Sequence, residues 1–252
     1  MIEMIIQFLY ATVIWMLSAY VTVRLMKFLY IMCLSIYGHF ICSPLDLTSY
    51  KSYWTVVTGC TDGIGRAYVE ELARSRGLRK FFLIGRNASK LQQVQKELGQ
   101  RYNCEIQIAQ FDFEHDDYDK LPVKQLNHLK IGILVNCAGI GPESVANFAE
   151  LPPGLPSKIL KGWRPLPYMS TYPASKAAIS FFSDSLTDEF YNTNVKVQCL
   201  IPLLVATKIA SYDAKDANWM VVDTNSYARQ AVNVIGQWRI STGCFMHDIQ
   251  VS

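Results

Sequence analysis

The chain has 252 residues, of which 50% are hydrophobic, 12% aromatic and only 18% charged. So much apolar side chain with a net charge of only +3 excludes a disordered chain. The 24 basic residues barely outnumber the 21 acidic ones, and this balance argues against a nucleic-acid partner. The seven cysteines and four histidines are scattered without a zinc-ligand or disulfide-scaffold pattern, so we expect no metal site.

The first apolar segment is long enough to cross a membrane. Residues 4–23 are all uncharged, with Glu3 before them and Arg24 and Lys27 after them. A helix of about 20 residues rises about 30 Å, the thickness of the hydrocarbon layer of a bilayer. Because the basic residues follow the span, the positive-inside rule predicts that the rest of the chain faces the cytoplasm. A buried core helix and a cleaved signal peptide are less favoured, since the segment has no polar face and no basic residue before it.

A second uncharged stretch, residues 28–45, contains a glycine, a histidine and a proline and is a weaker candidate for a crossing. We interpret it as a tyrosine-rich segment that lies along the membrane surface, and a second crossing stays open. Residues 1–45 are therefore expected to form a membrane anchor, and residues 46–252 a separate domain.

Within that domain the chain alternates between strand and helix patterns. Apolar or alternating runs predict strands at residues 54–57, 81–84, 105–113 and 131–136, with a final strand at 243–247. Helices are expected at residues 66–76, 89–101 and 226–237, the last of them capped by Thr224 or Asn225. Strands that alternate with helices form a parallel sheet, so the predicted fold is α/β, a Rossmann-type doubly wound sheet.

The first strand runs directly into a glycine-rich turn, Thr58-Gly59-Cys60-Thr61-Asp62-Gly63-Ile64-Gly65. A strand that turns at once into a helix leaves free N–H groups and the positive end of the helix dipole facing outward, which suits a pyrophosphate. Glycines let the backbone turn and let the phosphates approach. The G-x-x-x-G-x-G spacing differs from the commoner G-x-G-x-x-G, and a simple tight turn is the alternative. Its position at the start of a βαβ unit favours a dinucleotide site.

The end of the second strand indicates which dinucleotide binds. Gly85 and Arg86 follow that strand, and no acidic residue occurs before Glu97. An acidic residue here would bind a ribose 2′-hydroxyl, whereas a basic residue accommodates a 2′-phosphate. The sequence therefore favours NADP(H), and a solvated surface arginine is the alternative.

A second group of polar residues is Tyr172-Pro173-Ala174-Ser175-Lys176. Residues four apart share one face of a helix, so the Tyr172 phenol and the Lys176 ammonium can approach the same reacting atom. A free tyrosine has a pKa of about 10, and a nearby cation lowers that pKa toward neutral pH. The Tyr-x-x-x-Lys pattern alone is common by chance. The predicted dinucleotide turn earlier in the chain makes a catalytic interpretation of it stronger.

Three motifs together resemble the short-chain dehydrogenase/reductase family. They are Thr58-Gly59-x-x-x-Gly63-Ile64-Gly65, Asn136-Cys137-Ala138-Gly139 and Tyr172-x-x-x-Lys176. The stretch from Pro202 to Lys208 is similar to one membrane-anchored branch, which holds 17β-hydroxysteroid dehydrogenases and long-chain 3-oxoacyl-CoA reductases. The resemblance covers the whole chain, the anchor included.

The resemblance implies that a hydride passes between nicotinamide and a carbonyl carbon while Tyr172 exchanges the proton on oxygen. Lys176 would bind the ribose and lower the pKa of Tyr172. Asp112 would meet the adenine, and Val205 and Thr207 would lie near the carboxamide. The catalytic pair is thus Tyr172 and Lys176. The expected cofactor-binding residues are Gly59, Thr61, Asp62, Gly63, Ile64, Gly65, Arg86, Asp112, Asn136, Ala138, Gly139, Tyr172, Lys176, Val205 and Thr207.

The sequence departs from the family between Gly139 and Tyr172. The family has a long helix and a further central strand there, whereas this chain has 33 residue steps and six prolines. A βαβ crossover takes about 30 residues or more, so about one βα unit is missing, with the junction near residues 160–162. The family's catalytic serine belongs to that unit, and neither Ser157 nor Ser170 stands in its register. Unpaired strand groups are costly, so either the chain rebuilds the sheet or the sequence is a shortened form.

We therefore predict a membrane-anchored, NADP(H)-dependent oxidoreductase that acts on a hydrophobic carbonyl or alcohol, either a steroid or a 3-oxoacyl-CoA. The expected location is the endoplasmic reticulum membrane, with the domain facing the cytosol. Membrane lipid and the hydrophobic substrate are the expected partners, and a homodimer stays open. The competing hypothesis is a catalytically inactive relative that retains at most cofactor binding.

Overall fold

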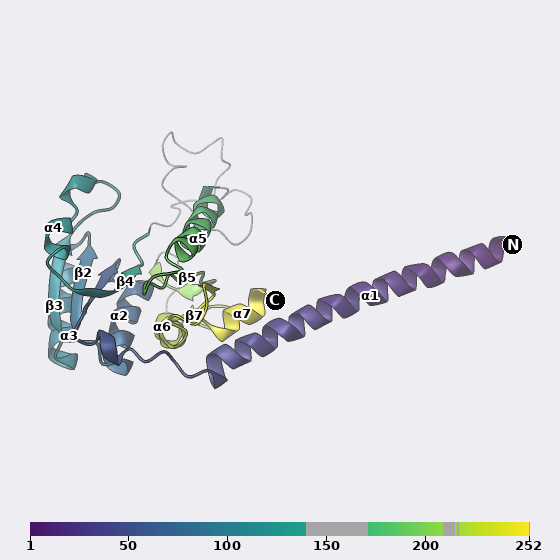
Figure 1. Cartoon of the computed structure of the whole chain (residues 1–252), viewed down its shortest axis with the longest axis horizontal. Helices are drawn as coiled ribbons and strands as arrows, with labels where there is room; N and C mark the ends of the chain where they lie inside the picture. Colours follow the sequence, from purple (N-terminus) through teal and green to yellow (C-terminus); the bar gives the residue numbers. More distant parts are fainter. Residues whose placement is uncertain (140–170, 209–214, 216, 252) are drawn as a thin grey trace.

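The structure, a computed structural model, describes the chain except for residues 140–170, 209–214, 216 and 252 (Figure 1). A long helix, α1 (Ile2–Ile36), leads through one π-helical turn (Tyr37–Ile41) into an α/β domain. The strands of the domain are β1 (Trp54–Thr58), β2 (Lys80–Gly85), β3 (Glu105–Gln110), β4 (Ile131–Asn136), β5 (Cys199–Leu200), β6 (Val205–Ala206), β7 (Val222–Asp223) and β8 (Ile240–Ser241). Its helices are α2 (Gly63–Ser75), α3 (Ala88–Tyr102), α4 (Val123–Leu126), α5 (Thr171–Glu189), α6 (Thr224–Asn233) and α7 (Phe245–Val251), with 3-10 turns at Thr48–Tyr50 and Tyr118–Lys120.

The main sheet has four parallel strands in the order β3-β2-β1-β4, which confirms the predicted Rossmann-type fold. The predicted strands 54–57, 81–84 and 131–136 agree with β1, β2 and β4 to within one residue at each end. The predicted strand 105–113 ends earlier, at Gln110, which pairs with Gly85 and is the last residue of β3. The carboxyl ends of all four strands therefore meet at one edge, as a dinucleotide fold requires.

The two faces of the sheet are covered unequally. Successive side chains of a strand point to opposite faces, so Val57 and Leu83 pack with α2, α3 and α6 in the larger core. Val56 and Phe82 point to the other face, into a smaller cluster that adjoins the leucines around the short helix α4. All four side chains are fully or almost fully buried.

The outer edge of β4 is uncovered in the described part of the chain. There, β4 pairs only with β1, while β5–β8 and β6–β7 form two separate two-stranded sheets. Leu134 on β4 is 60% exposed, and Phe181 on α5 is 75% exposed. The loss of one strand and its helix would leave such surfaces. The predicted junction itself falls within residues 140–170, outside the described residues.

Two predictions near the C-terminus are wrong. The cap of α6 is Asp223, not Thr224 or Asn225, because its carboxylate accepts hydrogen bonds from the N–H groups of Asn225 (3.0 Å) and Ser226 (2.9 Å). The predicted strand at 243–247 is instead a turn followed by α7. Gly243, with φ of +78°, ends the extended backbone right after β8, and a Cβ there would lie 2.6 Å from the hydroxyl of Tyr227.

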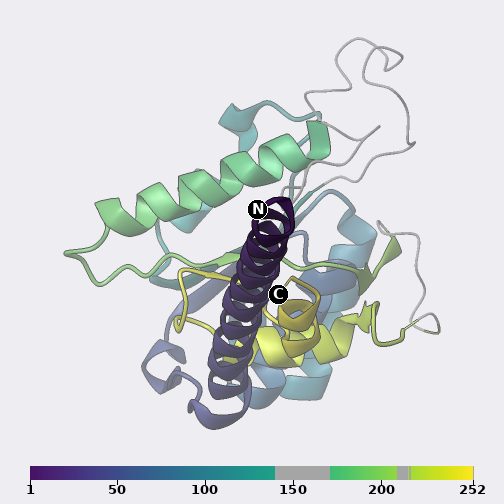
Figure 2. The same cartoon turned by 90° about the vertical axis from the view of Figure 1, so that its right-hand side faces the viewer.

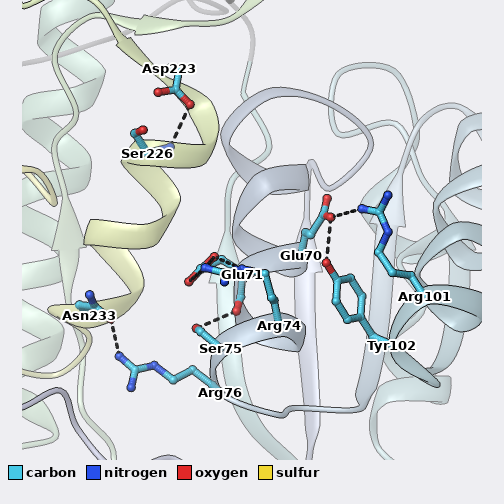
Figure 3. A network of polar contacts seen from close by, with 10 residues as sticks. All are labelled: Glu70, Glu71, Arg74, Ser75, Arg76, Arg101, Tyr102, Asp223, Ser226 and Asn233. Carbon is cyan, nitrogen blue, oxygen red and sulfur yellow. Dashed lines mark hydrogen bonds and ion pairs between the residues drawn. The ribbon is translucent and has the colours of Figure 1, made fainter.

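Polar contacts hold α2 between its neighbours (Figure 3). Arg76 at its end donates to the side chain of Asn233 on α6 over 2.8 Å. Glu70 accepts from Arg101 (2.6 Å) and Tyr102 (3.1 Å) on α3. These contacts fix the position of α2, and with it the turn from β1 into that helix.

His247 makes the stability of the fold sensitive to pH. Its side chain is fully buried, Nδ1 accepts from the N–H of Leu203 over 3.3 Å, and Nε2 lies 3.3 Å from the carbonyl oxygen of Leu204. The imidazole is therefore neutral with its proton on Nε2. Burial lowers its pKa below the usual value of 6.5.

The free energy of unfolding should fall as the pH is lowered from about 7.5 to about 5.5. The unfolded chain binds a proton at His247 in this range that the folded chain does not, so stability present at neutral pH is lost toward acid. A His247→Gln variant should lose this part of the pH dependence in urea unfolding. The control His115→Gln, whose imidazole is 66% exposed, should retain it. Equal pH dependence in the two variants would contradict the assignment.

Candidate cofactor site at the turn between β1 and α2

The turn after β1 has a backbone that only glycine fits well. Gly59 and Gly63 have φ of +65° and +56°, in the left-handed region. A Cβ on Gly59 would lie 2.7 Å from backbone atoms of Cys137 and Ala138, just beyond β4. The turn therefore rests directly on the chain that leaves β4.

A side-chain bridge holds these two segments together. The hydroxyl oxygen of Thr58 accepts hydrogen bonds from the N–H groups of Cys137 and Ala138, both over 3.1 Å. In addition, a Cβ on Gly65 would lie 2.3 Å from the carbonyl oxygen of Gly59, so the first turn of α2 packs onto the same loop. Asn136, paired with Thr58 in the sheet register, therefore lies beside the glycine turn.

Asp62 makes one backbone hydrogen bond and two ion pairs at this turn. Its side chain caps α2 by accepting from the N–H of Gly63 over 3.0 Å. It also pairs with Lys208 (2.8 Å) and Lys90 (3.3 Å). The hydrogen bond from Lys208 is the main reason that the pKa of Asp62 is lowered, and the bonds from Gly63 and Lys90 add to it.

Sequence reasoning did not predict that these two lysines join the site. The one signal for Lys208 was that it follows Thr207. Lys90 stands on α3, 28 residues from Asp62 along the chain, and local spacing does not predict that the two meet. Asp62 and its neighbours line a small pocket of about 230 Å³ that is open to solvent. Its lining residues are Thr61, Asp62, Arg66, Lys90, Gln93, Val94, Glu97 and Lys208.

Arg86 and Asp112 lie together at the ends of β2 and β3. Arg86 is exposed, and its carbonyl oxygen accepts from the side chain of Gln110 over 3.1 Å. The carboxylate of Asp112 accepts from the N–H of Glu114 and contacts His115, and these bonds lower its pKa, with a smaller contribution from Arg86. The guanidinium thus stands at the strand end where a 2′-phosphate would lie.

The segment from β6 lies across the glycine turn. Val205 is buried, and the methyl group of Thr207 would be 3.3 Å from a Cβ on Gly63. The side chain of Thr207 therefore covers Gly63. This brings the two residues expected near the carboxamide to the same edge of the sheet as Asn136 and Gly59.

Helix α5 brings Lys176 to the segment that follows β4. Tyr172 is the second residue of α5 and Lys176 stands one turn later, while Pro173 falls in the first turn, where a missing N–H costs nothing. The Lys176 ammonium lies 3.8 Å from the position of a Cβ on Gly139, and burial lowers the pKa of Lys176. Ser157 and Ser170 lie outside the described residues.

A family model described as short chain dehydrogenase matches residues 53–154 and 159–218. The chain belongs to the short-chain dehydrogenase family. The match is in two parts, and the break between them comes within a few residues of the predicted junction.

Curated relatives differ in length from this chain. "Uncharacterized oxidoreductase dhs-27" of Caenorhabditis elegans is 54% identical over 144 residues, which are 57% of this chain and only 18% of that protein. "Very-long-chain 3-oxoacyl-CoA reductase" of Mus musculus is 34% identical over 234 residues, 79% of this chain and 73% of that protein. "Inactive hydroxysteroid dehydrogenase-like protein 1" of Pongo abelii is 34% identical over 243 residues, 82% of this chain and 73% of that protein.

The mouse alignment contains positions that this chain lacks. It runs over 234 positions, but 79% of this 252-residue chain is about 199 residues, so about 35 positions have no counterpart here. That is the length of one βα unit. Among solved structures, a short-chain dehydrogenase from Sphingobium yanoikuyae in complex with NADPH has a TM-score of 0.61 and 22% identity, covering 71% of this chain and 83% of that chain. This likeness shows the fold.

Replacing Gly59 by alanine should destabilise the chain by about 1–3 kcal/mol, because the new Cβ meets backbone at a left-handed φ. The measurement is urea unfolding of the full chain in detergent micelles. The matched control is Gly99→Ala inside α3, where the nearest atom would lie 3.7 Å away. That change should stabilise the helix by about 0.5–1 kcal/mol. If the two variants unfold alike, the close approach described above does not exist.

Proposed function

We propose that the chain is an NADP(H)-dependent oxidoreductase, anchored in a membrane, that exchanges a hydride with the carbonyl or hydroxyl group of a lipid. The observation that carries this proposal is that the Lys176 ammonium of α5 lies beside Gly139, in the segment after β4 whose Cys137 and Ala138 pack against the glycine turn. The helix that carries Tyr172 and Lys176 thus comes close to the predicted phosphate-binding turn. Family membership supplies the reaction class.

The residues around the turn fit a dinucleotide. Gly59 and Gly63 let the turn fold tightly against the chain after β4 and against Thr207, and the start of α2 offers N–H groups and the positive end of its dipole to the pyrophosphate. Arg86 would pair with the 2′-phosphate, and Asp112 would accept from the adenine. When bound, the nicotinamide supplies or accepts the hydride.

The remaining chemistry belongs to Tyr172 and Lys176. Tyr172 would donate its phenolic proton to the substrate oxygen during reduction and take it back during oxidation. The Lys176 ammonium would stabilise the phenolate between those steps. Its partial burial strengthens this interaction, because charges attract more strongly away from water.

A lipid substrate is supported by two features. The mouse relative is described as a reductase of very-long-chain 3-oxoacyl-CoA, and the relative from Pongo abelii as hydroxysteroid dehydrogenase-like. Within the described residues, α1 and its π-helical extension form the one helix long and apolar enough to cross a membrane. With Arg24 and Lys27 after the span, the domain would face the cytosol, and the endoplasmic reticulum is the compartment we propose.

A second candidate function is cofactor binding without catalysis. It is favoured by the 35 or so absent positions, by the exposed edge of β4, and by a relative that is described as inactive. In that case NADPH would bind at the glycine turn and no hydride would leave it.

Turnover decides between the two candidates. We expect the full chain in micelles to oxidise NADPH faster than NADH when given a long-chain 3-oxoacyl-CoA or a ketosteroid. Tyr172→Phe should lower this rate by about 10²–10⁴-fold, because the proton donor is lost. The control Tyr118→Phe changes a phenol that is 72% exposed and should leave the rate unchanged.

The outcomes separate the hypotheses. A native chain that binds NADPH without oxidising it would support the inactive relative. If the Tyr172→Phe variant keeps the native turnover rate, the assigned mechanism is wrong, but the proposed cofactor site is not contradicted.

A further inference from the structure

The base of α1 is joined to the domain through one carboxylate. Ser35 near the end of α1 donates to Asp248 Oδ2 over 2.6 Å, and His39 Nε2 lies 3.1 Å from the same oxygen. From the domain side, the Thr242 hydroxyl donates to Asp248 Oδ1 over 2.5 Å. Burial alone would raise the pKa of Asp248, but the hydrogen bonds from His39, Ser35 and Thr242 outweigh it and lower that pKa.

Apolar packing closes the same junction. The ring of Phe40 meets Phe245 of α7 edge to face, with centroids 5.1 Å apart. Gly38 is buried against the indole of Trp238, whose Nε1 would lie 3.1 Å from a Cβ at that position. The link between α1 and the domain is therefore a packed contact, unlike a flexible linker.

The length of α1 fixes how far the domain can stand from a bilayer. The helix contains no glycine or proline, and residues 21–30 are exposed, while Ser35 is buried against the domain. If residues 4–23 fill the hydrocarbon layer, the seven residues 24–30 add only about 10 Å. The headgroup layer on one side of a bilayer is about 5–8 Å thick. The domain therefore begins where the headgroups end.

One face of the domain points the same way as α1. In Figures 1 and 2, α1 leaves the domain beside α7, and α5 and the C-terminus lie on the side toward which it projects. Gln250 at the end of α7 donates to the carbonyl oxygens of Trp219 and Met220. The side chains of Trp219 and Met220 are 67% and 45% exposed, as expected for a surface that meets a membrane interface.

We propose that the bond network of Asp248 with Ser35 and His39 holds the domain in one orientation, with the end of α7 and residues Trp219 and Met220 against the lipid headgroups. The proposal rests on the proposed membrane anchor. It places α5, which carries Tyr172 and Lys176, at the bilayer surface, from which a lipid substrate enters.

The test is tryptophan quenching of the full chain in phosphatidylcholine vesicles. One set of vesicles carries a spin label on the headgroup and the other carries bromine on the acyl chains. The contribution of Trp219 is the difference between the native chain and Trp219→Phe, and that of Trp15 is obtained in the same way. We expect the headgroup label to quench Trp219 and the bromine to quench Trp15.

A Ser35→Ala, His39→Ala double variant should release the domain. It removes the bonds from Ser35 and His39 to Asp248 and leaves the Thr242 bond intact, and urea unfolding of the variant checks that the domain is folded. Bonds to a charged group are strong enough that the docked orientation should weaken about tenfold or more. The control Thr22→Ala removes a hydroxyl that bonds only within α1, to Ser18.

Three results would overturn parts of the account. If Trp15 is quenched and Trp219 is not, the anchor stands and the docking is wrong. If the double variant keeps native quenching of Trp219, the Asp248 network does not set the orientation. If Trp15 is not quenched by bromine, the proposed membrane anchor itself fails.

Discussion

The carboxyl ends of β1 and β4 approach so closely that no side chain fits between them at Gly59. The Thr58 hydroxyl accepts two backbone N–H groups from the chain leaving β4, and this bridge sets the spacing. The bridge and the register of β1 with β4 together place Asn136 and Ala138 beside the glycine turn. The packing of α2 against α3 and α6 keeps the other side of the turn in place.

The strand that leads into the glycine turn lies inside the sheet. β1 is buried between β2 and β4, whereas the exposed residues Leu134 and Phe181 lie on β4 and α5. If a βα unit beyond β4 is absent, the groups that are lost belong to the substrate and catalytic side of the site, and the phosphate-binding turn remains. Cofactor binding and catalysis can fail separately in such a chain, which is why the two candidate functions differ in catalysis alone.

Sequence patterns predicted those features that arise from local spacing. The strands β1, β2 and β4 lie within one residue of their predicted positions, and the glycine turn lies between β1 and α2 as predicted, because these features depend on adjacent residues. The strand predicted at 243–247 is wrong because Gly243 ends the extended backbone where it packs against Tyr227 of α6, a contact between distant residues. The Asp223 cap, by contrast, bonds to Asn225 and Ser226 and is local. Lys90, Lys208 and the joint between Asp248 and Ser35 pair residues 28 to 213 positions apart, and no local pattern encodes such distances.

Hydrogen exchange of the full chain, measured by mass spectrometry with and without NADPH, tests the central claim that the glycine turn holds the dinucleotide. The account predicts slower exchange at residues 59–65 and 136–139, larger with NADPH than with NADH, because the bound phosphates occupy the free N–H groups at the start of α2. Unchanged exchange at both segments under saturating NADPH would show that the turn is not a cofactor site.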